Sequence, residues 1–164
     1  MNKQSGFSLI ELMIVVAIML VIAAVAIPAV VASNQAGNES AAVNTMRTFV
    51  TAENSYRNLF PSIGYSSTAA KLGGALDPAK CPNIPDPAGT WSCLMADPIA
   101  TKLDAGTLGN YTWTYARPDA DSYTLLANPS SASSGRKSYF VDASGAIHYK
   151  FGSGAGAADP LLGQ

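Results

Sequence analysis

The sequence predicts an α+β fold in which one long N-terminal helix packs on an antiparallel sheet of about four strands. Three patterns support this prediction. Residues 7–32 are almost entirely apolar, residues 33–60 carry apolar side chains at helical spacing, and residues 110–151 alternate between apolar and polar side chains. A chain of 164 residues has room for one domain beside such a helix.

The first of these segments has the length of a membrane span. Residues 1–6 form a short polar leader that contains Lys3, and residues 7–32 form the hydrophobic part of the helix. A helix needs about 20 apolar residues to cross a bilayer. Because no Lys or Arg follows the apolar segment before Arg47, the positive-inside rule places the N-terminus in the cytoplasm and the bulk of the chain outside.

Glu11 is the one acid in this apolar segment. A carboxylate inside a membrane costs about 2.5–3.5 kcal/mol on insertion scales, so such a residue is expected to have a function and a charged partner. If the chain is cut after Gly6, the new amine of Phe7 lies about one helical turn from Glu11. The amine of one copy would then neutralise the carboxylate of the next copy.

The run Gly6-Phe7-Ser8-Leu9-Ile10-Glu11 follows a short leader and opens the apolar segment. It resembles the N-terminus of type IV pilins and type II secretion pseudopilins. This resemblance is close over residues 1–60, and residues 139–147 look like the last hairpin of many pseudopilins. It implies that a prepilin peptidase and methyltransferase cleaves between Gly6 and Phe7 and methylates the Phe7 amine. It also implies that Glu11 is needed for filament assembly by an inner-membrane platform and its ATPase. Major pilin, minor pilin and secretion pseudopilin all remain open.

The helix is expected to continue from the membrane segment into the domain. Pro28 removes one backbone hydrogen bond, which predicts a kink, whereas the resemblance to pilins implies a helix that loosens here in the filament. Residues 33–60 form the amphipathic half, which ends before Pro61. The predicted core stripe consists of Ala42, Met46, Phe49, Tyr56 and Phe60, with Glu53 in the same series.

Residues 61–109 are rich in Pro and Gly, which predicts a surface loop region between helix and sheet. Short helices are expected to start at Ser67 or Thr68 and at Asp97, where a capping acid precedes a first-turn proline. A loop of this kind is where surface-exposed functional residues are expected. No residue within it stands out as such.

Cys81 and Cys93 are the two cysteines of the chain, and both fall in this loop region. They lie outside the cytoplasm under the predicted topology. An even number of cysteines in an oxidising compartment favours a disulfide. Two unpaired buried thiols are the alternative.

Residues 110–151 predict an antiparallel meander. Its strands are expected to begin near Tyr111 and Tyr123 and to include residues 137–141 and 146–150, with one face on the amphipathic helix. The tail, residues 152–164, consists mainly of small residues and is expected to be flexible, because it has no apolar run long enough to pack.

Several kinds of chemistry have no support in the sequence. The net charge of −1 argues against electrostatic binding of nucleic acid. The single histidine, His148, cannot make a zinc site alone, and no nucleophile elbow, phosphate-binding loop or dinucleotide fingerprint is present. Asp119 and Asp121 are weak candidates for a calcium ion, and a solvated turn is the favoured interpretation. No cofactor is expected.

The sequence therefore predicts a structural filament subunit and not an enzyme. The precursor is expected to be a single-pass inner-membrane protein, and the mature chain to form a homopolymeric filament outside the cell, as in a type IV pilus or a pseudopilus. Such a filament would serve adhesion, motility, DNA uptake or protein secretion. The alternative is a secreted or membrane-tethered binding domain that does not polymerise, because Ala24-Val25-Ala26 offers an ordinary signal-peptide cleavage site.

Overall fold

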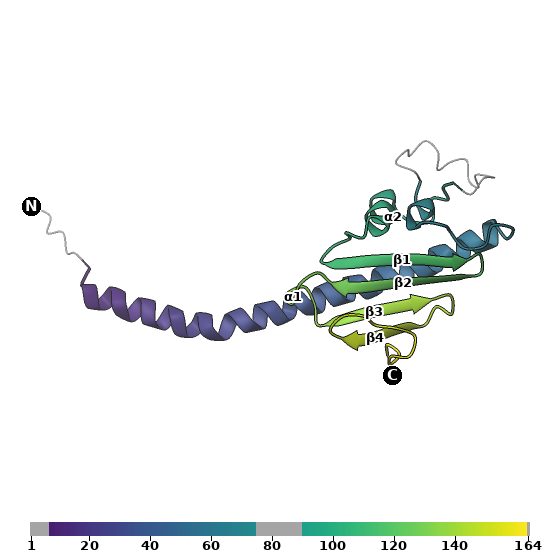
Figure 1. The fold of residues 1–164 in the computed structure, drawn as a ribbon. Coiled ribbons are helices and arrows are strands. Elements are labelled where there is room, and N and C mark those ends of the chain that lie inside the picture. The colour runs from purple at the N-terminus through teal and green to yellow at the C-terminus, as the bar shows by residue number, and fades with distance from the viewer. Residues whose placement is uncertain (1–6, 75–89, 164) are drawn as a thin grey trace, which may run out of the picture.

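The computed structural model describes residues 7–74 and 90–163. It has the predicted α+β architecture: a long helix extends away from a domain in which the sheet lies across the C-terminal half of that helix (Figure 1). The helices are α1 (Leu9–Leu59), the 3-10 helix η1 (Ala69–Leu72) and α2 (Asp97–Asp104). The strands are β1 (Tyr111–Asp119), β2 (Ser122–Pro129), β3 (Lys137–Asp142) and β4 (Ile147–Phe151).

Helix α1 is continuous over 51 residues and passes through Pro28 without a break. Its N-terminal half is bowed and projects from the domain (Figure 1). By length and composition this half is able to cross a membrane, and none of its most apolar stretch is buried. Loosening of the helix at Pro28 stays a prediction about the assembled filament.

The C-terminal half of α1 provides one wall of the core. The predicted stripe is buried, with Met46, Phe49 and Tyr56 completely shielded from solvent. The Phe49 ring packs edge-on against Tyr115 and Tyr123, at centroid distances of 5.4 and 5.7 Å. These aromatic contacts join the helix to the first two strands.

The sheet is a simple meander with strand order β1-β2-β3-β4, and all its pairs are antiparallel. Alternation along the strands places one set of side chains on α1: Leu125 pairs with Val141 in register, and both are fully buried. This confirms the predicted meander and its packing on the amphipathic helix.

Replacing Phe49 with alanine is expected to lower the free energy of unfolding by about 3–5 kcal/mol, because the ring fills the centre of the helix–sheet core. The measurement is thermal or denaturant unfolding of the full chain in detergent, followed by circular dichroism. The matched control is Thr48→Ala on the exposed side of the same turn. A loss no larger for Phe49→Ala than for this control would contradict the assignment of the core.

The tail was expected to be flexible, and for residues 152–163 this prediction was wrong. The tail folds back along β4, the edge strand of the sheet. The Tyr149 amide donates to the Pro160 carbonyl at 2.9 Å, and the Leu162 amide donates to the Ile147 carbonyl at 2.8 Å. Together with Leu162, which packs against the core, and the Ser138 hydroxyl, which accepts the Ala155 amide, these backbone hydrogen bonds hold the tail and cover an otherwise open strand edge.

Candidate assembly site

The start of α1 positions Glu11. Ser8, a residue type that favours the position before a helix, precedes the first turn, and Glu11 occupies the third helical position. The Glu11 Oε2 atom accepts a hydrogen bond from the Ser8 backbone amide at 2.9 Å, as in a capping box. The carboxylate therefore turns back toward the N-terminus of the helix, where unpaired amides and the helix dipole favour a negative charge.

Phe7 is the residue next to this carboxylate in the chain. It precedes the helix and is 89% exposed. The Phe7 nitrogen directly precedes, along the backbone, the Ser8 nitrogen that donates its hydrogen bond to Glu11. The other carboxylate oxygen, Oε1, accepts no hydrogen bond from any described residue, so it can take an additional positively charged donor. Gly6 lies outside the described residues, and cleavage after it stays a prediction.

A continuous apolar surface follows Glu11 along the helix. Every large apolar side chain from Leu9 to Val31 is exposed, for example Leu9 at 75% and Val25 at 76%. Monomeric soluble proteins rarely expose apolar patches larger than a few hundred Å². This surface therefore requires lipid or other protein chains around it.

Glu53 is a second functional candidate whose chemistry the sequence did not reveal. Its carboxylate is completely buried within the core stripe. It accepts hydrogen bonds from the Ser66 amide at 2.9 Å, the Ser66 hydroxyl at 2.6 Å and the Tyr115 hydroxyl at 2.9 Å. Burial raises the pKa of Glu53, and these hydrogen bonds and the nearby Arg117 oppose that effect only in part. In the sequence, the only sign of this role was the position of Glu53, an acid, within an otherwise apolar stripe.

The turn after α1 brings Ser66 to this carboxylate. Gly64 has φ of +83°, and a Cβ at this position would collide with the Ala120 carbonyl. The Tyr65 amide donates to that same carbonyl at 2.9 Å. Only glycine permits so close a contact here. Glu53 thus fastens the loop to the helix and stabilises the domain.

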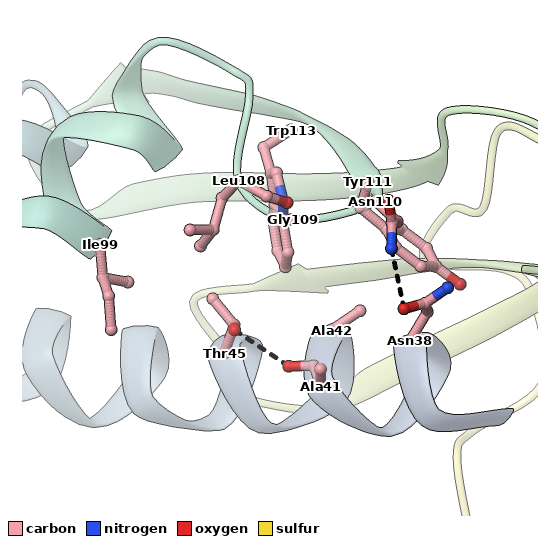
Figure 2. Close-up of a pocket in the computed structure, with 10 residues that line it drawn as sticks. All are labelled: Asn38, Ala41, Ala42, Thr45, Ile99, Leu108, Gly109, Asn110, Tyr111 and Trp113. Carbon is pink, nitrogen blue, oxygen red and sulfur yellow. Dashed lines mark hydrogen bonds between the residues drawn. The ribbon is translucent and has the colours of Figure 1, made fainter. Parts of the chain in front are cut away.

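A groove on another side of α1 has different chemistry. Figure 2 shows a groove between α1 and the segment before β1, with Asn110 hydrogen-bonded to Asn38 at 2.9 Å. The indole of Trp113 forms part of its wall. No charged side chain lines this groove, which therefore has no acid, base or cation for catalysis.

Comparison with known proteins identifies the family. Residues 1–27 match the family model described as the prokaryotic N-terminal methylation motif. Over 126 residues the chain is 31% identical to "Type IV wide pilus major component PilA4" of Thermus thermophilus. The aligned segment covers 75% of this chain and 88% of the relative. This chain belongs to the type IV pilin family. No solved structure matches it.

The methylation motif of this pilin includes both residues of the candidate assembly site, Phe7 and Glu11. It also extends over most of the exposed apolar surface of α1. The two features that the geometry singles out, the N-terminal acid and the apolar helix, are therefore the features that the family model matches.

The weak calcium candidates of this pilin already have protein partners. Asp119 Oδ1 accepts the Asp121 amide at 2.8 Å, and hydrogen bonds from Ser122 and Asp121 lower the pKa of Asp119. Asp121 pairs with Arg57 at 2.7 Å. In the described parts of the chain, no group of three or more His, Cys, Asp or Glu side chains could hold a metal ion.

The predicted disulfide involves a residue that the structure does not describe. Cys81 lies outside the described residues, so pairing with Cys93 stays a prediction. Cys93 itself has φ of +52°, and its amide donates to the Gly73 carbonyl at 3.1 Å. This contact holds the segment before α2 against the end of η1.

Proposed function

We propose that this pilin is the repeating subunit of a type IV pilus, a homopolymer held together by the apolar half of α1. The observation that carries this proposal is the exposed apolar surface from Leu9 to Val31 with a single acid, Glu11, at its start. The name of the relative, a pilus major component, favours a pilus over a secretion pseudopilus.

The precursor waits in the inner membrane as a single-pass protein with its N-terminus in the cytoplasm. The membrane-spanning half of α1 is solvated by lipid in this state. Lipid and neighbouring helices are similarly apolar, so burial from water does not by itself favour the filament. Extraction therefore requires work from an assembly platform and its ATPase.

Cleavage after Gly6 by a prepilin peptidase converts the Phe7 nitrogen into an amine, which then carries a methyl group and a positive charge. In the filament this amine binds the free Oε1 of Glu11 on a neighbouring copy. A carboxylate buried without a partner is costly, so this pair also selects the axial register between neighbours. The same contact repeats from copy to copy in an open helical assembly.

The substitution Gly6→Val tests this order of events. It is expected to block cleavage, so the chain should remain in the membrane fraction with residues 1–6 attached and yield no filaments in the fraction sheared from cells. Immunoblotting and mass measurement of both fractions provide the readout. Filaments sheared from cells that make only this variant would contradict the proposal, whereas Ser5→Ala is the matched control and should assemble normally.

A further inference from the structure

The end of the domain nearest the apolar half of α1 is closed by the loop between β2 and β3, residues 130–136. Two side chains of α1 hold this loop. Gln35 Nε2 donates to the Ala132 carbonyl at 2.7 Å, and Asn38 Nδ2 donates to the Ser134 carbonyl at 2.9 Å. The loop is thereby fixed beside the part of α1 that directly follows the apolar surface.

A basic residue at the end of this loop is positioned with donors to spare. Arg136 is exposed, and its backbone amide donates to Glu39 Oε1 at 2.8 Å. Its Nε donates to Gln35 Oε1 at 3.1 Å. The side chain has no other hydrogen bond to a described residue, so both terminal guanidinium nitrogens are available for an anion.

Lys137 and Phe151 complete this surface, which we call the basal face: Arg136, Lys137 and Phe151. The Lys137 amine lies 5.4 Å from the centre of the Phe151 ring and 4.0 Å from Glu39 Oε2. Phe151 is 68% exposed although it is an aromatic side chain. A groove of about 270 Å³ separates the basal face from α1, and Glu39 is the one acid that lines it.

The position of the basal face along α1 corresponds to the surface of a membrane. At 1.5 Å per residue the apolar stretch from Leu9 to Val31 spans about 33 Å, close to the hydrocarbon thickness of a bilayer. Gln35, which accepts the Arg136 Nε, then lies about 6 Å beyond that stretch, at the level of the phospholipid headgroups. Glu39 lies about 12 Å beyond the stretch, on the water side of the headgroup layer.

We propose that the basal face binds the phospholipid headgroups of the outer leaflet before assembly, with Arg136 and Lys137 on the phosphates and the Phe151 ring at the interface. This inference rests on the membrane-anchored precursor of the proposed function. Basic side chains bind anionic headgroups, and apolar side chains such as Phe next to Lys and Arg enter the boundary between headgroups and acyl chains. The contact holds the domain upright on α1 and must be released when a subunit leaves the membrane.

The first test measures depth. The full precursor is reconstituted in vesicles of phosphatidylcholine and phosphatidylglycerol that contain lipids brominated near the headgroup, and quenching of tryptophan fluorescence is compared with that of the parent chain. We expect quenching of Phe151→Trp to be several-fold larger than that of Leu59→Trp. Leu59 is also partly exposed but lies about 42 Å beyond Val31 along α1. Val25→Trp, measured in vesicles whose lipids are brominated on their acyl chains, reports whether the helix itself is inserted.

The outcomes separate this inference from the proposed function. If Val25→Trp is strongly quenched while Phe151→Trp is quenched no more than Leu59→Trp, the basal face does not bind lipid and the inference is overturned. This is also the result expected if the basal face contacts another copy of the chain instead of lipid. If Val25→Trp is not quenched, the membrane-anchored precursor itself is wrong.

The second test removes charge. In the Phe151→Trp background, Arg136→Gln and Lys137→Gln together should abolish the additional quenching that phosphatidylglycerol produces over pure phosphatidylcholine. Arg47→Gln, an exposed charge higher on α1, is the matched control and should leave that increment unchanged. If the additional quenching by phosphatidylglycerol remains after the loss of both basal charges, the proposed headgroup contact is overturned. The same holds if the Phe151→Trp chain with both charges shows no additional quenching.

Discussion

Glu11→Val is expected to leave the precursor in the membrane and to remove nearly all filaments. Valine suits the lipid environment better than a carboxylate does, so insertion should not suffer. In the filament, however, the Phe7 amine of the neighbouring copy would be buried without a partner. Breaking one side of a buried charge pair costs about 3–5 kcal/mol, which weakens each contact by a factor between about 10² and about 4 × 10³.

Glu11→Gln separates charge from helix capping. The glutamine oxygen can still accept the Ser8 amide, as Glu11 Oε2 does at 2.9 Å, but it cannot balance an amine. The glutamine variant should therefore fail to assemble filaments, as the valine variant does. The measurement is the ratio of chain in sheared filaments to chain in membranes. Normal filament yield from Glu11→Gln would show that the cap, and not the charge pair, is what assembly needs.

Glu53→Ala is expected to destabilise the domain by about 3 kcal/mol, because the buried amide and hydroxyl of Ser66 both lose their acceptor. The Tyr115 hydroxyl keeps the Ser66 carbonyl as an acceptor. The matched control is Asn54→Ala, the exposed neighbour on the same helix. The measurement is chemical unfolding of the full chain in detergent, and a loss equal to that of the control would contradict a role for Glu53 in fastening the loop.

The raised pKa of Glu53 gives this prediction a pH dependence with a defined sign. A carboxyl group whose pKa is higher in the folded than in the unfolded state contributes most below its unfolded pKa, and this contribution is lost as pH rises through the folded pKa. Glu53→Gln has no such loss. It can satisfy the same site, because the Tyr115 hydroxyl also lies 2.6 Å from the Ser66 carbonyl and can donate there.

The stability of Glu53→Gln relative to the natural chain should therefore improve as pH rises from about 4 to about 8. The difference in free energy of unfolding between the two chains removes the contribution of every titrating group that both chains retain. One such group is Asp119, whose lowered pKa makes stability change with pH in the opposite direction. A difference that stays constant over this range, or that declines, would contradict burial as the dominant influence on Glu53.

The elements that the sequence predicted well are those with a repeating apolar pattern. The stripe that includes Met46 and Phe49 identified the buried side of α1, and the alternation from Tyr111 identified the first strand. Asp97 was correctly expected at the start of α2, but it does not cap the helix: the residue before the first turn is Ala96, and Asp97 accepts the Gly74 amide instead. Local periodicity of apolar residues determines the elements that were predicted well.

Contacts between distant polar groups could not be predicted in this way. Glu53 meets Ser66 only because the turn at Gly64 has a particular geometry, and Arg57 meets Asp121 across 64 positions of sequence. The tail also escaped prediction, since backbone hydrogen bonds and single side chains such as Leu162 hold it, and neither leaves a periodic apolar pattern. Within the assembly site the sequence identified Glu11 itself, whereas the free Oε1 required the structure.

The most direct measurement is the mass of the N-terminal peptide from purified native filaments. Pairing of the Phe7 amine with Glu11 predicts a chain that begins at Phe7 and carries one methyl group on its amine. Ordered filaments whose subunits retain residues 1–6, or begin after Ala26, would contradict it, because neither chain could place a charged Phe7 amine beside Glu11.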